Sequence, residues 1–254
     1  MVRFASLIAI LVLLSADCLA GREANAIVQA FPKTIILDSS VGTIGGNRYL
    51  AAIILDESQS AIALVVFRPD HVSNYKFHSR SGWWDRHQRQ HSESVKVRNN
   101  SVYFSYAGNG GCCSDYFWQY QFKLRDGKFS LVGLQSSNTG FEPKEDSNGI
   151  STEGRTVSYR YGSSINYLTG VITHWRIQAP SSSESHDAVF KDDIFKIKLG
   201  KTRVEKRFNF VPTKIYLLDG FDIGSTAEGS EFSKELERLP GLGYFDQRFK
   251  YHEP

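Results

Sequence analysis

The stretch YFWQYQFKLRDGKFSLVGL, residues 116–134, decides the fold class of this chain. Its first half alternates apolar with polar residues, which is the period of two that is typical of a half-buried β-strand. Asp126-Gly127 then provides a two-residue turn that follows the twist of paired strands. The turn predicts three cross-strand pairs: Leu124 with Phe129, Phe122 with Leu131, and Tyr120 with Gly133. The stretch therefore predicts an antiparallel hairpin with one apolar face.

Segments on both sides of this hairpin also have strand character. Residues 49–55 (YLAAIIL) and 61–67 (AIALVVF) are apolar runs that flank a polar loop, which predicts a hairpin of two central strands. Further strands are expected at 95–98 and 102–106 around Asn99-Asn100, at 156–161 and 171–178 around residues 168–170, and at 194–199 and 214–218. Only residues 230–239 have a helical pattern, which Pro240-Gly241 ends. We expect a mainly β fold, an antiparallel sandwich or small barrel-like sheet, with one short C-terminal helix.

The N-terminus has the pattern of a secretory signal peptide. Arg3 precedes an apolar run at residues 4–14, and small and polar residues follow that run. The run is too short to cross a bilayer as a helix. We therefore expect a periplasmic or secreted protein whose mature chain has no membrane span.

This pattern leaves two cleavage sites open. Cleavage after Ala26 fits the small-x-small rule better than cleavage after Ala20, because both recognised positions are alanine in Ala24-Asn25-Ala26. The alternative site follows Cys18-Leu19-Ala20. A lipoprotein anchored through Cys18 is disfavoured, since Asp17 stands where a small residue is needed.

Composition divides the chain into three parts. Residues 1–26 are the expected signal peptide, residues 27–180 a β domain, and residues 181–254 a C-terminal extension with strands and the short helix. A polar, serine-rich stretch at 179–185 precedes the extension, which we expect to pack on the same domain. The net charge of +3 is too small to indicate a nucleic-acid partner.

Cys112 and Cys113 are adjacent, and they are the cysteines that remain once the signal peptide is removed. Exported thiols tend to oxidise, so a strained vicinal disulfide is one interpretation. Two free, partly buried thiols are a second interpretation. A functional redox or metal pair is a third, although neither a C-x-x-C motif nor a neighbouring histidine supports it.

Two stretches resemble segments of a group of uncharacterised exported bacterial β-domain proteins. They are GGCCSDYFWQYQFKLRDGKFSLVGLQ at 110–135 and SINYLTGVITHW at 164–175. In that group a glycine-rich turn precedes an aromatic hairpin, and some members carry repeats like those of FG-GAP or integrin-α proteins, with calcium loops. The resemblance covers roughly residues 35–178. It implies a β fold and no activity, and it implies no calcium site because residues 43–58 lack the loop.

No motif in the sequence indicates catalysis, a metal or a cofactor. Nucleophile elbows, phosphate-binding loops and zinc-protease motifs are missing. His87 and His91 have the spacing of two helical metal ligands, but no glutamate lies between them and Arg89 would repel a cation. Ser114, Ser136 and Ser163 lack the glycine-rich turn that exposes a nucleophile. We therefore expect no metal and no cofactor, and a binding protein rather than an enzyme.

The candidate for binding is a basic and aromatic segment at residues 68–98. It holds seven Lys or Arg residues against three Asp or Glu residues. The candidate binding residues lie in its middle: Trp83, Trp84, Arg86, His87 and Arg89. Such side chains are suited to binding another protein, as an inhibitor or immunity-type partner does. They are also suited to binding an envelope glycan such as peptidoglycan. In a plainer interpretation the tryptophans pack in the core and the charges face water. A hydrolase whose site forms only in three dimensions is a further alternative.

Overall fold

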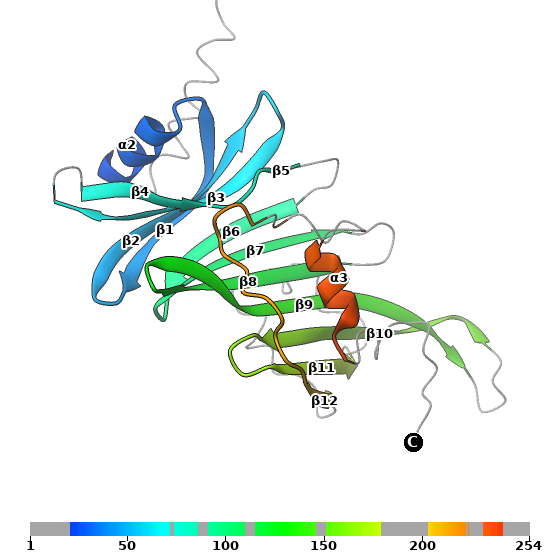
Figure 1. The fold of residues 1–254 in the computed structure, drawn as a ribbon. Coiled ribbons are helices and arrows are strands. Elements are labelled where there is room, and N and C mark those ends of the chain that lie inside the picture. The colour runs from blue at the N-terminus through cyan, green and yellow to red at the C-terminus, as the bar shows by residue number, and fades with distance from the viewer. Residues whose placement is uncertain are drawn as a thin grey trace, which may run out of the picture.

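The computed structural model describes residues 21–71, 74–85, 91–109, 115–145, 151–178, 203–221, 223 and 231–240. These form two antiparallel sheets and two helices (Figure 1). Sheet A contains β1 (Thr34–Ile44), β2 (Asn47–Asp56), β3 (Ala61–Asp70), β4 (Asn74–Arg80) and the short β5 (Trp84–Asp85). Sheet B contains β6 (His91–Arg98), β7 (Ser101–Asn109), β8 (Asp115–Arg125), β9 (Lys128–Glu145), β10 (Ser151–Asn166), β11 (Val171–Gln178) and β12 (Arg203–Asn209). The helices are α2 (Gly21–Ala30) and α3 (Glu231–Arg238). The prediction of a mainly β, sandwich-like fold is confirmed.

Sheet A is buried on both faces. Alternate residues of β2 and β3 enter two clusters, because successive side chains of a strand point to opposite faces. The inner cluster lies between the two sheets and includes Ala51, Ile53, Leu64 and Val66. The outer cluster lies on the opposite face of sheet A and includes Ile27, Leu50, Ala52, Ile54, Ala63, Val65, Phe67 and Tyr75. Helix α2 covers this outer face, which explains why both strands are continuous apolar runs (Figure 1).

Sheet B has one apolar face, which completes the inner cluster. A buried row crosses five of its strands: Phe104, Tyr120, Leu134, Ile165 and Ile172. Helix α3 packs on this row, and its Phe232 ring lies 6.3 Å from the Tyr120 ring. The opposite face of the same strands is polar. There Gln119 donates to Ser105 at 2.9 Å and Gln121 to Ser101 at 3.0 Å.

The two sheets meet where β1 lies against β6. The side chains of Asp38 and Ser40 accept the backbone N–H groups of Val95 at 2.7 Å and Val97 at 3.0 Å. Gly42 allows this approach, since a Cβ there would lie 2.1 Å from the carbonyl oxygen of Val97. Side-chain acceptors thus replace a backbone ladder at the junction.

The hairpin at 116–134 forms as predicted near its turn and differs farther away. Leu124 pairs with Phe129 and Phe122 pairs with Leu131, which confirms those two pairs. A bulge then shifts the register, so that Gly133 lies opposite Gln121 and not opposite Tyr120. The bulge adds Val132, which is buried and accepts the N–H of Tyr167 at 3.0 Å.

Other predicted elements have mixed outcomes. The hairpins around 56–60, Asn99-Asn100 and 168–170 are confirmed, and α3 lies within the predicted helix. The strand predicted at 214–218 is wrong, because only an isolated bridge joins Leu217 to Ser130 there. Helix α2 was not predicted. The segments 179–185 and 194–199 lie outside the described residues. Neither α2 nor α3 has the length and apolar composition of a membrane-spanning helix.

Candidate functional site

The tryptophans of the basic segment lie on a short arch, residues 80–84, that joins two strands. β4 ends at Arg80 and β5 begins at Trp84, and both strands pair with β3. Ser81, in the middle, is buried and donates its N–H to the Leu64 carbonyl at 2.9 Å. Its hydroxyl in turn accepts the N–H of Leu64 at 2.9 Å. Two bonds to one residue of β3 therefore fix the centre of the arch.

A distant segment of the chain holds the other side of the arch. After β12 the chain crosses back to sheet A, as the orange trace in Figure 1 shows. Gly220 donates its N–H to the Arg80 carbonyl at 3.0 Å, and Gly82 donates its N–H to the Phe221 carbonyl at 2.9 Å. The N–H of Arg80 is 3.3 Å from Asp219 Oδ1. The arch is thus bound on both flanks, which makes it a rigid support for its side chains.

The arch presents an arginine stacked on a tryptophan. The guanidinium carbon of Arg80 lies 5.0 Å from the ring centre of Trp83, within the range of a cation–π interaction. Both side chains are half-buried, and Trp83 packs against the outer cluster. Arginine and tryptophan are among the side chains most enriched in protein-interface hot spots. Together, Arg80 and Trp83 form what we call the Arg–Trp platform.

Trp84 has a different environment from its neighbour. It pairs with Ile62 of β3, and its ring lies 5.2 Å edge-on from the Phe104 ring of sheet B. It contacts both the inner and the outer cluster. Trp84 therefore serves packing between the layers, while Trp83 lies with Arg80 on the outer side.

Two further cations lie on β3 and β4, and their side chains point to the opposite face of sheet A from Arg80 and Trp83. Arg68 and Lys76 are exposed and directly opposite each other, an arrangement that costs stability because like charges repel. Between Lys76 and Arg80, His78 is an extra residue of β4, since Val66 pairs with Ser79 and Phe67 with Phe77. Burial, and then the charge of Arg68, lower the pKa of His78, while Asp219 opposes them. This histidine is accordingly neutral near pH 7.

Several predicted site residues fall outside the described part of the chain. They are Arg86, His87 and Arg89 of the basic segment, and the adjacent Cys112 and Cys113. Within the described residues, no three His, Cys, Asp or Glu side chains gather as a metal site requires. The arch and its Arg80 thus represent the binding candidate, and Arg80 was not among the residues singled out from the sequence.

A second polar group lies on sheet B beneath the end of α3. The Oγ of Ser163 is 2.7 Å from Nδ1 of His174, and Nε2 of His174 is 3.0 Å from the Pro240 carbonyl oxygen. A carbonyl can only accept, so Nε2 carries the hydrogen and Nδ1 accepts from the serine hydroxyl. Burial lowers the pKa of His174, against the effect of the Pro240 carbonyl, so the ring is neutral near pH 7.

The predicted turn did not give this pair. A turn at residues 168–170 would place Tyr167 opposite Val171, and hence Ser163 opposite Trp175. In the structure the turn also includes Tyr167, so Asn166 lies opposite Val171 and Ser163 opposite His174. The contact with Pro240 could not be found from the sequence either, because 66 residues separate it from His174.

Comparisons with known proteins add no relative. No family model, no curated protein and no solved structure was found to match the chain.

Proposed function

We propose that this chain is an exported binding protein of the cell envelope that recognises another protein, as an inhibitor or immunity-type partner does. The observation that carries the proposal is the Arg–Trp platform, with its 5.0 Å stacking on a rigid arch. A pre-organised aromatic anchor loses little side-chain entropy on binding, which favours affinity.

The glycan alternative has less support from the geometry. Sugar rings stack on exposed aromatic faces, and two adjacent tryptophans would offer two such faces. Here the Trp84 ring contacts Phe104, so the arch offers Trp83 together with a cation and not a pair of platforms. A peptidoglycan-binding function nevertheless makes a distinct prediction, namely co-sedimentation with purified cell wall.

Quantitative capture with matched variants tests the proposal. Tagged mature protein is incubated with native envelope extract without reductant, and the retained proteins are quantified by mass spectrometry. We expect one stoichiometric protein, whose capture falls at least about tenfold in Arg80→Ala and Trp83→Ala, as for a hot spot. Arg98→Ala is the matched control, because Arg98 stacks on Tyr103 at the same 5.0 Å away from the arch.

The outcomes of the capture experiment distinguish a role for the platform in binding a protein from an effect on stability and from glycan binding. Equal capture by the wild type and Trp83→Ala contradicts a role for the platform. An equal loss in Arg98→Ala means that the losses reflect stability and not binding. If the wild type sediments with purified cell wall and Trp83→Ala does not, the Arg–Trp platform binds a glycan and not a protein.

A second candidate function rests on the Ser163–His174 pair. A neutral imidazole that accepts a serine proton is the arrangement of a nucleophile and its general base. Here a carbonyl holds the far nitrogen, whereas a catalytic carboxylate would also stabilise the imidazolium that forms. Labelling with a fluorophosphonate probe tests the candidate: wild-type protein that labels, and Ser163→Ala that does not, would establish a hydrolase. Absence of label in both would leave the pair a structural contact.

A further inference from the structure

Helix α2 has one face that is part of the folded core. Ile27 is fully buried in the outer cluster, and Ala26 and Phe31 pack against that cluster. Glu23, one turn before Ile27, is 5 % exposed. Gly21 and Arg22 at the start of the helix are exposed. The spacing of Glu23, Ile27 and Phe31 is that of a helical stripe, so one face of the chain packs on sheet A from Glu23 to Phe31, just past the end of α2.

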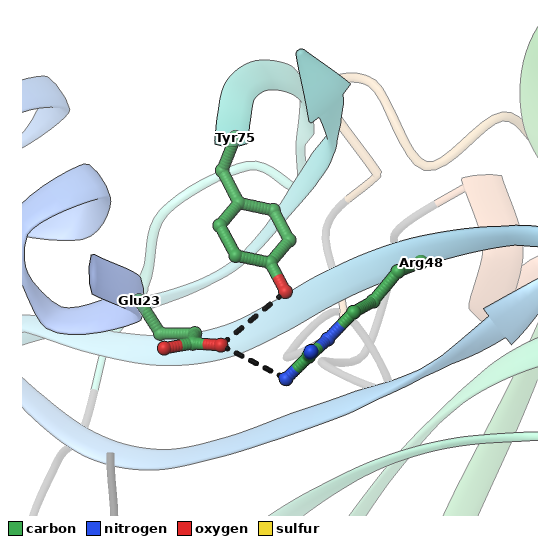
Figure 2. Close-up of polar contacts among 3 residues, drawn as sticks. All are labelled: Glu23, Arg48 and Tyr75. Atoms are coloured by element: carbon green, nitrogen blue, oxygen red, sulfur yellow. Dashed lines mark hydrogen bonds and ion pairs between the residues drawn. The ribbon is translucent and has the colours of Figure 1, made fainter. Parts of the chain in front are cut away.

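The Glu23 carboxylate ties this helix to two strands of sheet A (Figure 2). Its Oε1 accepts from Arg48 on β2 at 3.1 Å, and the Tyr75 hydroxyl of β4 lies 3.4 Å from the same oxygen. Burial is the first cause that raises the pKa of Tyr75, and the nearby Glu23 carboxylate adds to it against the effect of Arg48. Both partners bind Oε1, while the other carboxylate oxygen, Oε2, is buried without a hydrogen-bond partner. The link between α2 and sheet A therefore runs through Oε1.

The two possible cleavage sites have opposite consequences for α2. Cleavage after Ala26 removes Glu23 and leaves Ile27 as the first residue. Its charged ammonium group would then sit on the residue whose side chain is fully buried, and only four residues of the helix would remain. Four residues do not sustain a helix, and burying a charge is costly. Cleavage after Ala20 places the ammonium on exposed Gly21, whose surroundings are open enough that a Cβ there would meet no atom within 4 Å.

We infer that this chain is processed after Ala20, so that the mature protein begins at Gly21 with α2 intact. Hydrolysis of the Ala20–Gly21 amide by one water leaves a carboxylate on the released peptide and an ammonium group on Gly21. The small residues Cys18 and Ala20 satisfy the peptidase at this site. The contacts of α2 thus point to the site that fits the small-x-small rule less well. The inference rests on the export proposed above.

The N-terminus of the exported protein tests the inference directly. The full chain is expressed in a bacterium, and the mass and first residues of the periplasmic product are determined. We expect a product that starts at Gly21. A product that starts at Ile27 overturns the inference and leaves export intact, whereas a chain that retains Met1 overturns both. Ala20→Asp should accumulate precursor, while Ala26→Asp should be processed at the wild-type rate; the reverse pattern overturns the inference.

A stability measurement gives an independent test. Glu23→Gln in the full chain should lower the Tm of the exported product by about 2–6 °C, because the buried Glu23 carboxylate loses its ion pair with exposed Arg48. Arg22→Gln, an exposed charge on the same helix, should leave the Tm unchanged. A Glu23→Gln product with the wild-type mass and Tm would show that residue 23 is absent from the mature protein and would overturn the inference.

Discussion

Sheets A and B are buried in different ways, and the difference explains their sequences. Sheet A lies between α2 and sheet B, so β2 and β3 are apolar on both faces. Sheet B contributes one face to the inner cluster, and on its other face β8 carries Gln119 and Gln121, which bond to serines of β7. A strand with two buried faces depends on a second covering layer, which here is the N-terminal helix. Sheet A is therefore the region whose stability depends on α2.

A polar residue on the outer face of each sheet should give the largest difference between them. We expect Val65→Asn to lower the free energy of unfolding by about 3–4 kcal/mol, because Val65 is fully buried in the outer cluster and an unpaired amide would replace it. Thr173→Asn, on the polar face of β11, should cost less than about 1 kcal/mol. Chemical denaturation measures both values. Equal losses would show that the outer face of sheet B is as tightly covered as that of sheet A.

The junction between the sheets gives the next largest effect. Gly42→Ala would place a methyl group 2.1 Å from the Val97 carbonyl oxygen, so β1 and β6 must separate. We expect a loss of about 2–3 kcal/mol. Gly133→Ala on sheet B is the matched control, since its methyl group meets the end of the flexible Gln121 side chain at 3.0 Å. Its cost should stay below about 1 kcal/mol, and a larger cost in the control would contradict a special closeness at the junction.

These two regions also show what sequence can predict. The hairpin around Asp126-Gly127 was predictable because a local turn and a period of two fix its first pairs. Strand β1 was missed because Asp38 and Ser40 interrupt its apolar pattern. Their role is to bind the backbone of β6, 57 residues away. Helix α2 was missed because a signal-peptide pattern extends into it.

The candidate site was predictable only in part, for the same reason. Trp83 and Trp84 are neighbours in the sequence, and composition alone assigned them one shared role. Their environments differ because the arch is held by β3 and by Asp219, which is 139 residues from Arg80. Contacts at that separation leave no local pattern, so Arg80 could not be chosen over the other cations of the segment.

A pH titration compares the sheets through one histidine in each, the half-buried His78 in sheet A and the buried His174 in sheet B. Burial lowers the folded-state pKa of His78 and of His174 below their ordinary value of 6.5. Below pH 6.5 the unfolded chain therefore binds protons that the folded chain does not, and stability falls with falling pH. We expect a lower Tm at about pH 5.5 than at about pH 7.5. His174→Gln should reduce this pH dependence, and an unchanged slope in that variant would contradict the expectation.

The smallest effect concerns the turns that close the hairpins of the two sheets. In sheet B the turn positions with positive φ are Asn99, Asn100, Asp126 and glycines, residue types that tolerate this conformation. In sheet A, Ser60 adopts a φ of 49° between β2 and β3, where serine has no such tolerance.

Ser60→Asn should accordingly raise the free energy of unfolding by about 0.5 kcal/mol by relieving backbone strain. The side chain of Ser60 is exposed, so the substitution changes no core packing. Asn100→Ser in sheet B is the mirror experiment, but it also removes the Asn100 Oδ1 that accepts the Gly45 N–H at 3.0 Å. It should therefore cost more than Ser60→Asn gains. Equal and opposite changes would mean that backbone strain alone decides both turns and that the Asn100 bond between the sheets contributes nothing.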